Sequence, residues 1–360
     1  MEKRYPKYFL AANSCEGFMS HFPDSFVAGE GWRAIIIKGG PGTGKSSFMK
    51  YIVARAAEKG YGVDLCICSS DPDSLDGVVI WDIKTVILDG TAPHIVEPKY
   101  PAACEEILNL GEFWDREKLF QKAQEIISVT NENKALHKQT SQYLTAAGEL
   151  LYDNLRLARK YTNEERAARF GTRIARKLIP EKAFKSPKEW IRFIGGITPK
   201  GVVAYKNTVN DFYKEKIIIE DKYGAAASVI MQGVRNEALK KGYEIITLKN
   251  PFLPSKIIDH ILIPELSLAF VTENEYINFG GEERRIHSRR FTDISLMREC
   301  RSRMLFNRRI TRELLLTAAE TLKKAKAIHD KLEKYYVDAM DFEKLSKYAI
   351  ETTKNIFTDF

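Results

Sequence analysis

The chain has 360 residues, of which 44% are hydrophobic and 29% are charged, and its formal net charge is +8. This composition is typical of a globular protein and argues against a fibrous, low-complexity or disordered chain. Its five cysteines do not suggest a disulfide framework and its first residues lack a signal-peptide pattern, so we expect a cytoplasmic protein. The longest apolar stretch, near residues 257–271, is interrupted by charged side chains, which predicts no membrane span and no membrane partner.

A phosphate-binding loop follows the first strongly apolar run of the chain. The run Ile35 to Ile37 predicts a short buried strand, and a helical pattern after the loop ends near Gly60. Between them, GGPGTGKS matches G-x-x-x-x-G-K-[ST] at every position. In this motif, backbone N–H groups bind phosphate oxygens, the lysine reaches the β- and γ-phosphates, and the hydroxyl binds Mg²⁺. We therefore predict a triphosphate site made by Gly39, Gly40, Pro41, Gly42, Thr43, Gly44, Lys45, Ser46 and Ser47.

The next predicted strand, residues 63–68, ends in a polar segment. Asp71 and Asp73 lie in this segment, where strand ends face the ligand crevice of open α/β sheets. Either aspartate can orient an attacking water or bind a substrate hydroxyl, but a polar turn explains both equally well. Cys66 and Cys68 are interpreted as small core residues, since no second Cys/His cluster accompanies them as a metal or redox site would require.

A third apolar run, Thr85 to Leu88, ends in Asp89 and has the Walker B pattern. Its aspartate is predicted to hold Mg²⁺ together with Ser46. His94 follows closely and is a candidate γ-phosphate sensor or acid/base, or else an ordinary polar residue. Lys45, Asp71, Asp73 and His94 form the predicted catalytic set. No glutamate follows Asp89, so either Asp71 or Asp73 substitutes for it or turnover is slow; the absence of an NKxD motif favours ATP over GTP.

A second copy of this pattern begins about 182 residues later. Strands are expected at residues 217–219 and 268–271, and DKYGAAAS at residues 221–228 aligns with the intact loop. Gly224 and Ser228 are retained, but Ala227 replaces the lysine. We expect this half to keep the fold and to have lost nucleotide binding, although a divergent mode of binding remains an alternative.

Other groups of the first half have disappeared together with the lysine. Thr272 stands in the place of Asp89, and Leu253 and Ser255 in the places of Asp71 and Asp73. Asp76 survives as Asp259 and is therefore interpreted as structural.

Each half continues into a long charged helical segment, poor in glycine and proline. The predicted fold is α/β, with tandem duplicated P-loop NTPase domains of three-layer α/β/α architecture, each followed by such a segment. The expected boundaries are residues 1–111 for the intact P-loop domain, 112–190 for its helical segment, 191–290 for the degenerate domain and 291–360 for the C-terminal helical segment.

Arginine and lysine are concentrated in two stretches. A solvated helix surface with interspersed acids explains them, and a phosphate-rich partner such as nucleic acid is the alternative. The first stretch holds Arg156, Arg159, Lys160, Arg166, Arg169, Arg173, Arg176 and Lys177, and the second holds Arg284, Arg285, Arg289, Arg290, Arg298, Arg301, Arg303, Arg308, Arg309 and Arg312.

The strings GGPGTGKS, CSSDPDSLDGV and ILDGTAPH resemble those of an uncharacterised bacterial family of duplicated P-loop NTPases, and the resemblance covers nearly the whole chain. It implies the duplicated fold and nucleotide binding. In that family both halves commonly carry an intact loop, from which this second half departs.

The sequence thus predicts an Mg²⁺- and ATP-binding P-loop NTPase with one active and one pseudo-nucleotide site, acting as an ATPase or ATP-driven switch. A nucleotide or small-molecule kinase and a nucleic-acid-associated NTPase remain alternatives.

Overall fold

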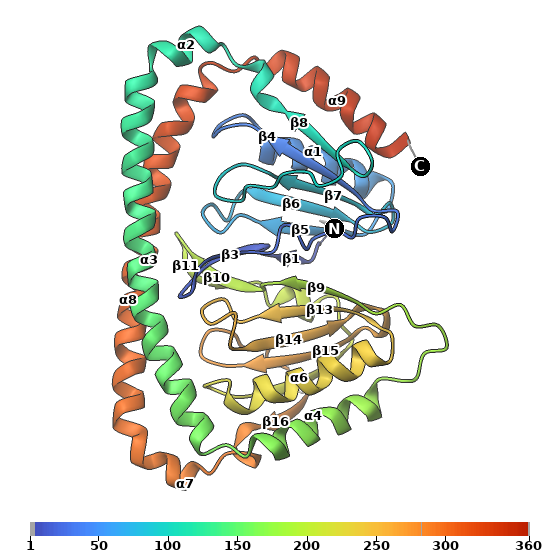
Figure 1. Cartoon of the computed structure of the whole chain (residues 1–360), viewed down its shortest axis with the longest axis vertical. Coiled ribbons are helices and arrows are strands. Elements are labelled where there is room, and N and C mark those ends of the chain that lie inside the picture. The colour runs from blue at the N-terminus through green and yellow to red at the C-terminus, as the bar shows by residue number, and fades with distance from the viewer. Residues whose placement is uncertain (1–3, 282, 359–360) are drawn as a thin grey trace. The chain divides into compact units, whose positions relative to one another are not determined.

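The computed structural model describes residues 4–281 and 283–358 (Figure 1). The ends of the first and last predicted segments, residues 1–3 and 359–360, lie outside this description. The protein is α/β, with two six-stranded mixed sheets and flanking helices. The chain forms two compact units. Unit 1 comprises the described residues of Met1–Ala11, Ser20–Thr140 and Glu320–Phe360, and unit 2 those of Ala12–Met19 and Ser141–Ala319.

The sheet of unit 1 has the order β1-β5-β6-β7-β4-β8. Strand β4 is parallel to both of its neighbours, whereas β6 is antiparallel to both of its own. Ile35 to Ile37 are fully buried in β4, so the predicted first strand is confirmed. The strands are β1 (Lys7–Tyr8), β4 (Arg33–Lys38), β5 (Val63–Ile67), β6 (Leu75–Ile80), β7 (Thr85–Asp89) and β8 (Glu105–Asn109).

The helices of unit 1 come from distant parts of the sequence. Helix α1 (Lys45–Glu58) buries Phe48, Ile52 and Ala56 and is followed by Gly60 at φ +80°, as the sequence predicts. Beyond the sheet the chain forms η1 (Leu110–Phe113), α2 (Arg116–Gln121) and the first part of α3 (Ala123–Lys160). The end of α8 (Arg301–Val337) and all of α9 (Phe342–Thr358) complete the unit.

The sheet of unit 2 repeats the strand order and directions of the first. Its order is β9-β13-β14-β15-β12-β16, read from the edge that corresponds to β1. The registers agree as well: Ile37 lies opposite Asp89, and Ile219 lies opposite Thr272. The strands are β9 (Lys188–Arg192), β12 (Glu215–Glu220), β13 (Glu244–Lys249), β14 (Ile258–Ile263), β15 (Leu268–Glu273) and β16 (Arg284–His287).

Two short hairpins also repeat each other. One pairs β2 (Ala11–Ser14) with β3 (Gly17–Ser20), and the other pairs β10 (Gly195–Thr198) with β11 (Gly201–Ala204). In each turn the last hydroxyl of the first strand donates to the first carbonyl of the second, from Ser14 to Gly17 and from Thr198 to Gly201. A shared side-chain bond at a matching position is stronger evidence of likeness than strand order alone.

The helices of unit 2 cover its sheet through a continuous apolar core. Helices α4 (Glu164–Leu178) and α6 (Ala225–Lys240) lie against each other, and Ala167, Ile174 and Ile230 belong to the same buried cluster as strand residues (Figure 1). The rest of α3 and the first part of α8 also belong to this unit. The shorter elements are α5 (Asn207–Asn210), η2 (Pro264–Leu266), η3 (Ser288–Arg290), α7 (Ile294–Met297) and η4 (Arg298–Cys300).

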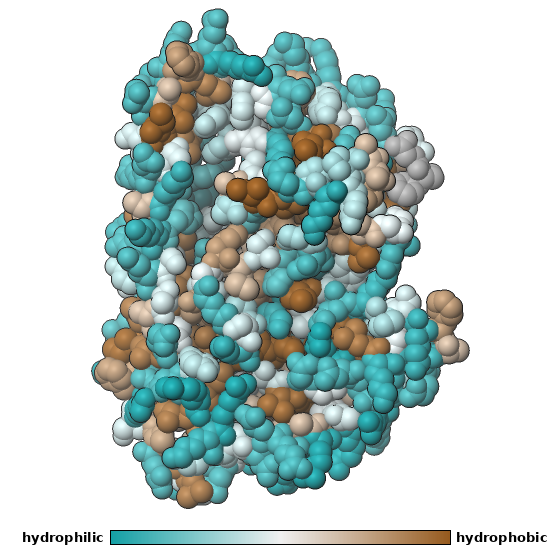
Figure 2. Space-filling view, in the orientation of Figure 1, coloured by the Kyte–Doolittle hydropathy of each residue, from teal (hydrophilic) through white to brown (hydrophobic). Residues whose placement is uncertain are grey.

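Polar side chains dominate the face of the molecule drawn in Figure 2. The face in Figure 2 is mostly hydrophilic, with hydrophobic residues in small scattered groups. Within the described part of the chain, no helix combines the length and apolar character needed to cross a bilayer.

Candidate nucleotide site and its degenerate counterpart

The loop between β4 and α1 holds its lysine inside its own turn. Lys45 Nζ donates to the carbonyl oxygens of Gly39 and Gly40, at 2.9 and 2.8 Å. The same ammonium lies 3.6 Å from Asp89 Oδ2, and both side chains are largely buried. Thr43 Oγ1 donates to Gly40 O and steadies the turn, whereas Ser47 is exposed on α1. The loop thus gathers a cation, a carboxylate and the N-terminus of a helix.

Strand pairing explains why Asp89 meets Lys45. Strands β4 and β7 are parallel neighbours and place Ile37 opposite Asp89, so the loop after one strand and the acid ending the other share an edge. Burial raises the pKa of Asp89, while Lys45 and the hydrogen bonds from Thr91 oppose that rise. Thr91 N donates to Asp89 Oδ1 at 2.9 Å, which fixes the orientation of the carboxylate. A buried, oriented carboxylate beside a lysine suits an Mg²⁺ shell.

Helices α8 and α9 contact the same loop, a feature that the sequence analysis did not anticipate. A Cβ on Gly42 would lie 2.8 Å from Glu333 O, and one on Gly44 would lie 3.2 Å from Leu345 Cδ2. A Cβ on Gly40 would lie within 3.3 Å of the rings of Trp114 and Tyr336. The loop is therefore contacted by Trp114 and by residues of α8 and α9 about three hundred positions away in sequence, and no local pattern marks them.

The two candidate aspartates after β5 occupy different positions. Asp71 is half-buried and accepts hydrogen bonds from Ser74 Oγ and the backbone N–H of Asp73, at 2.8 and 3.3 Å. Lys326 Nζ of α8 lies 3.6 Å from Asp71 Oδ2. Asp73 is exposed, and its backbone carbonyl accepts from Lys50. Asp71 is thus the one of the two placed against α8.

His94 lies in a buried pair with Asp76. Its Nε2 is 3.2 Å from Asp76 Oδ2, the two side chains are 7% and 9% exposed, and its ring stacks on Phe22. Asp76 also accepts a hydrogen bond from the Cys68 thiol, and burial raises the pKa of that thiol well above its usual value. A neutral, half-buried thiol agrees with the interpretation of Cys68 as a structural residue.

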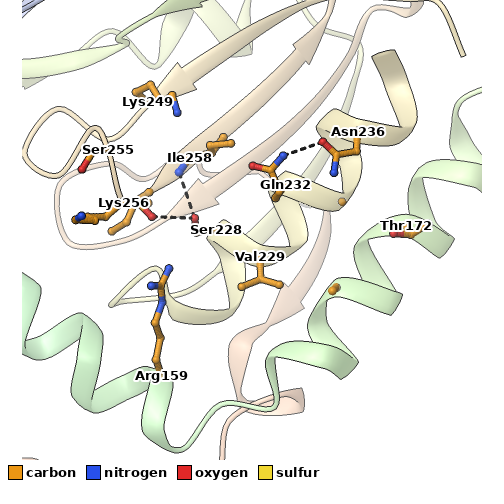
Figure 3. Close-up of a pocket in the computed structure, with 13 residues that line it drawn as sticks. Arg159, Thr172, Ser228, Val229, Gln232, Asn236, Lys249, Ser255, Lys256 and Ile258 are labelled. Atoms are coloured by element: carbon orange, nitrogen blue, oxygen red, sulfur yellow. Dashed lines mark hydrogen bonds between the residues drawn. The ribbon is translucent and has the colours of Figure 1, made fainter. Parts of the chain in front are cut away.

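Ser46 and its counterpart Ser228 make the same backbone contact. Ser46 Oγ accepts from Leu75 N at 3.0 Å, and Ser228 Oγ accepts from Ile258 N at 3.3 Å (Figure 3). Ser228 lines a cavity of about 400 Å³ in unit 2, together with Lys249 and Lys256. Because the bond survives where the lysine does not, one role of this serine is to tie the helix to the first residue of β6 or β14. Its remaining lone pair is available for a metal.

The residues of the intact loop fit Mg²⁺ and a triphosphate. Gly42 and Gly44 have φ values of +70° and +80°, which turn successive backbone N–H groups inward. Asp89 and Ser46 supply the oxygen ligands that Mg²⁺ prefers, and Lys45 supplies the counter-charge for phosphate.

Many arginines of the two basic stretches are engaged within unit 2. Arg156 and Arg303 pair with Asp153, and Arg285 pairs with Glu273. Arg308 and Arg312 lie near Glu275. These pairs favour the interpretation of the stretches as salt-bridged helix and strand surface.

No family model matches the chain, and no curated protein or solved structure matches it either. The functional conclusions below therefore depend on the geometry of the loop and its neighbours.

Proposed function

We propose that unit 1 binds Mg²⁺ and a nucleoside triphosphate, with ATP favoured, at the loop Gly39–Ser46 and hydrolyses it. The observation that carries the proposal is the position of Lys45, held by two loop carbonyls and 3.6 Å from Asp89. Phosphate oxygens replace those carbonyls as partners of the ammonium when a triphosphate enters the loop. The N-terminus of α1 adds a favourable field for the same anion.

Asp89 and Ser46 are proposed to hold Mg²⁺. The metal ion neutralises charge that builds up on the phosphoryl oxygens during transfer. Thr91 orients the Asp89 carboxylate, and Lys45 opposes the rise in its pKa that burial causes.

Asp71 is proposed to orient the attacking water. It is held by Ser74 and faces Lys326, which places a cation from α8 beside the acid. A cation supplied by another part of the same chain can stabilise transferring phosphate, as an arginine finger does in cis. His94 is assigned a supporting role, because it holds Asp76 rather than facing solvent.

We also propose that the two halves arose by duplication and that only the first retains the site. The matched strand order, the matched Ile37/Ile219 register and the two hairpin turns support this proposal. Ala227 and Thr272 leave the second half without the lysine and the metal-binding acid.

Calorimetric ATP binding and phosphate release, measured with Mg²⁺, test the proposal. Lys45→Ala should weaken binding about 10- to 100-fold, because a charge-assisted hydrogen bond contributes about 1.5–3 kcal/mol. Lys59→Ala, at the other end of α1, removes the same charge far from the loop and should bind as the wild type does. Equal affinities for wild type and Lys45→Ala would refute the proposal.

Asp71→Asn separates hydrolysis from the alternatives. We expect it to bind ATP normally and to release phosphate at least 10-fold more slowly. Phosphate transfer to an added acceptor, with little release in its absence, would instead indicate a kinase. Stimulation by nucleic acid with steep salt dependence would indicate the third alternative.

A further inference from the structure

Asp221 stands at the first position of the second loop, where the intact loop has Gly39. Its carboxylate points into the loop rather than away from it. Oδ2 accepts from the backbone N–H groups of Ala226 and Ala227, at 2.8 and 2.9 Å, and Oδ1 accepts from Tyr223 N at 3.2 Å. Asp221 is only 4% exposed, so these donors are its environment in place of water.

The backbone around Asp221 enters its helix as the intact loop does, through a glycine in the left-handed conformation. Gly224 has φ +73° and ψ +8°, and Gly44 has φ +80° and ψ +14°. In each case the glycine precedes the helix, and its carbonyl accepts from the residue four positions later, Ser228 or Phe48. In the alignment Gly224 corresponds to Gly42, so α6 begins two aligned positions earlier than α1, and the second loop is shorter.

The donors to Asp221 correspond to those that face phosphate in an intact loop. Ala226 and Ala227 align with Gly44 and Lys45, whose N–H groups lie at the start of α1. The first N–H groups of a helix have no partner within the helix and attract an anion. In the second loop, the carboxylate of Asp221, which aligns with Gly39, accepts the hydrogen bonds of these N–H groups.

We propose that the Asp221 carboxylate is a built-in anion that occupies the second loop in place of a phosphate group. The first N–H groups of α6 are then satisfied without any nucleotide. The wild-type loop takes no external anion, and removal of the side chain converts it into a site for an oxyanion such as pyrophosphate. The proposal does not depend on what the first loop binds.

Two substitutions at this position separate the charge from the space it fills. Asp221→Gly restores the residue of the intact loop and opens the turn. Asp221→Asn fills the same volume but removes the charge. It also replaces one carboxylate oxygen with an amide NH₂ group, which cannot accept a hydrogen bond. Both substitutions are made in a Lys45→Ala background, so that pyrophosphate binding at the first loop does not contribute to the signal. The test therefore remains valid even if the function proposed for the first loop is wrong.

Hydrogen exchange of the amides at residues 223–228 and the thermal unfolding midpoint give the two measurements. We expect both substitutions to speed exchange and to lower the midpoint by about 5 °C or more. Millimolar pyrophosphate should restore slow exchange and most of the midpoint in Asp221→Gly, and should do neither in Asp221→Asn. The Lys45→Ala parent, with Asp221 intact, should show no response to pyrophosphate at these amides.

Several results would overturn the proposal. A wild-type midpoint and exchange rate in Asp221→Asn would show that the charge is not needed. An equal response of the two variants to pyrophosphate would show general salt stabilisation rather than occupation of the loop. Asp221→Gly could fail to fold both with and without pyrophosphate. In that case Asp221→Asn decides alone, and normal stability of that variant refutes the proposal.

Discussion

Two buried carboxylates of unit 2, Asp221 and Asp259, differ in how their charge is compensated. Asp221 accepts three backbone hydrogen bonds, whereas the side-chain partner of Asp259 is the amide of Asn250, at 2.9 Å. Burial raises the pKa of Asp259 to about 7, and the neighbouring Asp221 adds to the rise. The residue retained from Asp76 is thus a weakly compensated acid.

Titration of Asp259 should make unit 2 less stable at high pH. An unfolded aspartate has a pKa of about 3.9, so between about pH 4 and pH 7 the folded state binds the extra proton. The stabilisation that protonation gives is complete below about pH 4 and is lost as the pH rises through 7. Asp259→Asn keeps the oxygen that accepts from Asn250 and removes the ionisation.

Urea unfolding at pH 5 and pH 8 measures this effect. Relative to wild type, Asp259→Asn should gain free energy of unfolding on the order of 2 kcal/mol between pH 5 and pH 8. Asp338→Asn removes a surface carboxylate and serves as the control. Parallel pH dependence of wild type and Asp259→Asn would contradict the assignment.

At the scale of elements, the loop Gly39–Ser46 is constrained from two sides. Its backbone must turn through φ +70° at Gly42, and the same residue lies against the carbonyl of Glu333 on α8. The loop is therefore a contact surface for a helix as well as the proposed cradle for an anion. A change in the loop that accompanies nucleotide binding must be transmitted to α8 or be resisted by it.

Gly42→Ala tests this double constraint, with Gly60→Ala as a matched control. Both glycines have φ near +75°, but Gly60 has open space where the new Cβ would stand. Gly60→Ala should cost only the left-handed strain of about 1–2 kcal/mol. Gly42→Ala adds the clash with Glu333 O, so we expect a free energy of unfolding at least about 1 kcal/mol lower still, together with weaker ATP binding. Equal denaturation midpoints for Gly42→Ala and Gly60→Ala would show that α8 moves away from the new methyl group without a loss of stability.

The sequence predicted the elements whose signals are local. The run Ile35–Ile37, the loop and the alignment of Asp89 with Thr272 could all be deduced from apolar runs and spacing, and strand register confirms that alignment. Contacts of the loop with Glu333 and Leu345 could not, because nothing near residue 42 encodes which distant helix packs there.

The second loop shows a different limit of sequence analysis. From the sequence, the notable feature of DKYGAAAS is the missing lysine. The structure shows in addition that the Asp221 carboxylate accepts hydrogen bonds from the backbone of the loop. Its signal was present in the sequence: an acidic residue at the loop's first position, just before a helix N-terminus. Such residues are common as caps, so the pattern alone does not distinguish a cap from an occupant of the loop.

At the scale of the whole molecule, unit 1 is assembled from separate stretches of chain. Glu320–Phe360 belongs to the unit that contains Lys45, whereas Ser141–Ala319 belongs to the other. Trp114 and Asp115 meet Met340 and Ala339 through backbone bonds, and Arg33 donates to Ile356 O. The proposed nucleotide site is therefore not contained in the first half of the sequence.

Truncation after residue 319 should damage unit 1 selectively. Removal of residues 320–360 uncovers the loop and the apolar contacts of α9, so we expect fast hydrogen exchange across β4 and α1 and loss of ATP binding. Ending the chain at residue 340 removes only α9 and should give an intermediate effect. Exchange within β12 and α6 is the internal control and should not change. Full protection of α1 in the shorter chain would contradict the assignment of α8 and α9 to this unit.

Because residues of unit 1's last segment contact the loop, the order of synthesis affects when the loop can be completed. A ribosome that adds about 5–20 residues per second needs on the order of 15–60 s to pass from Lys45 to Leu345. All the segments of unit 2 have been synthesised before the last segment of unit 1 is made. Under the proposals made for the two loops, unit 2 can thus mature with Asp221 as its own ligand, while the first loop waits until the segment after residue 319 has been made.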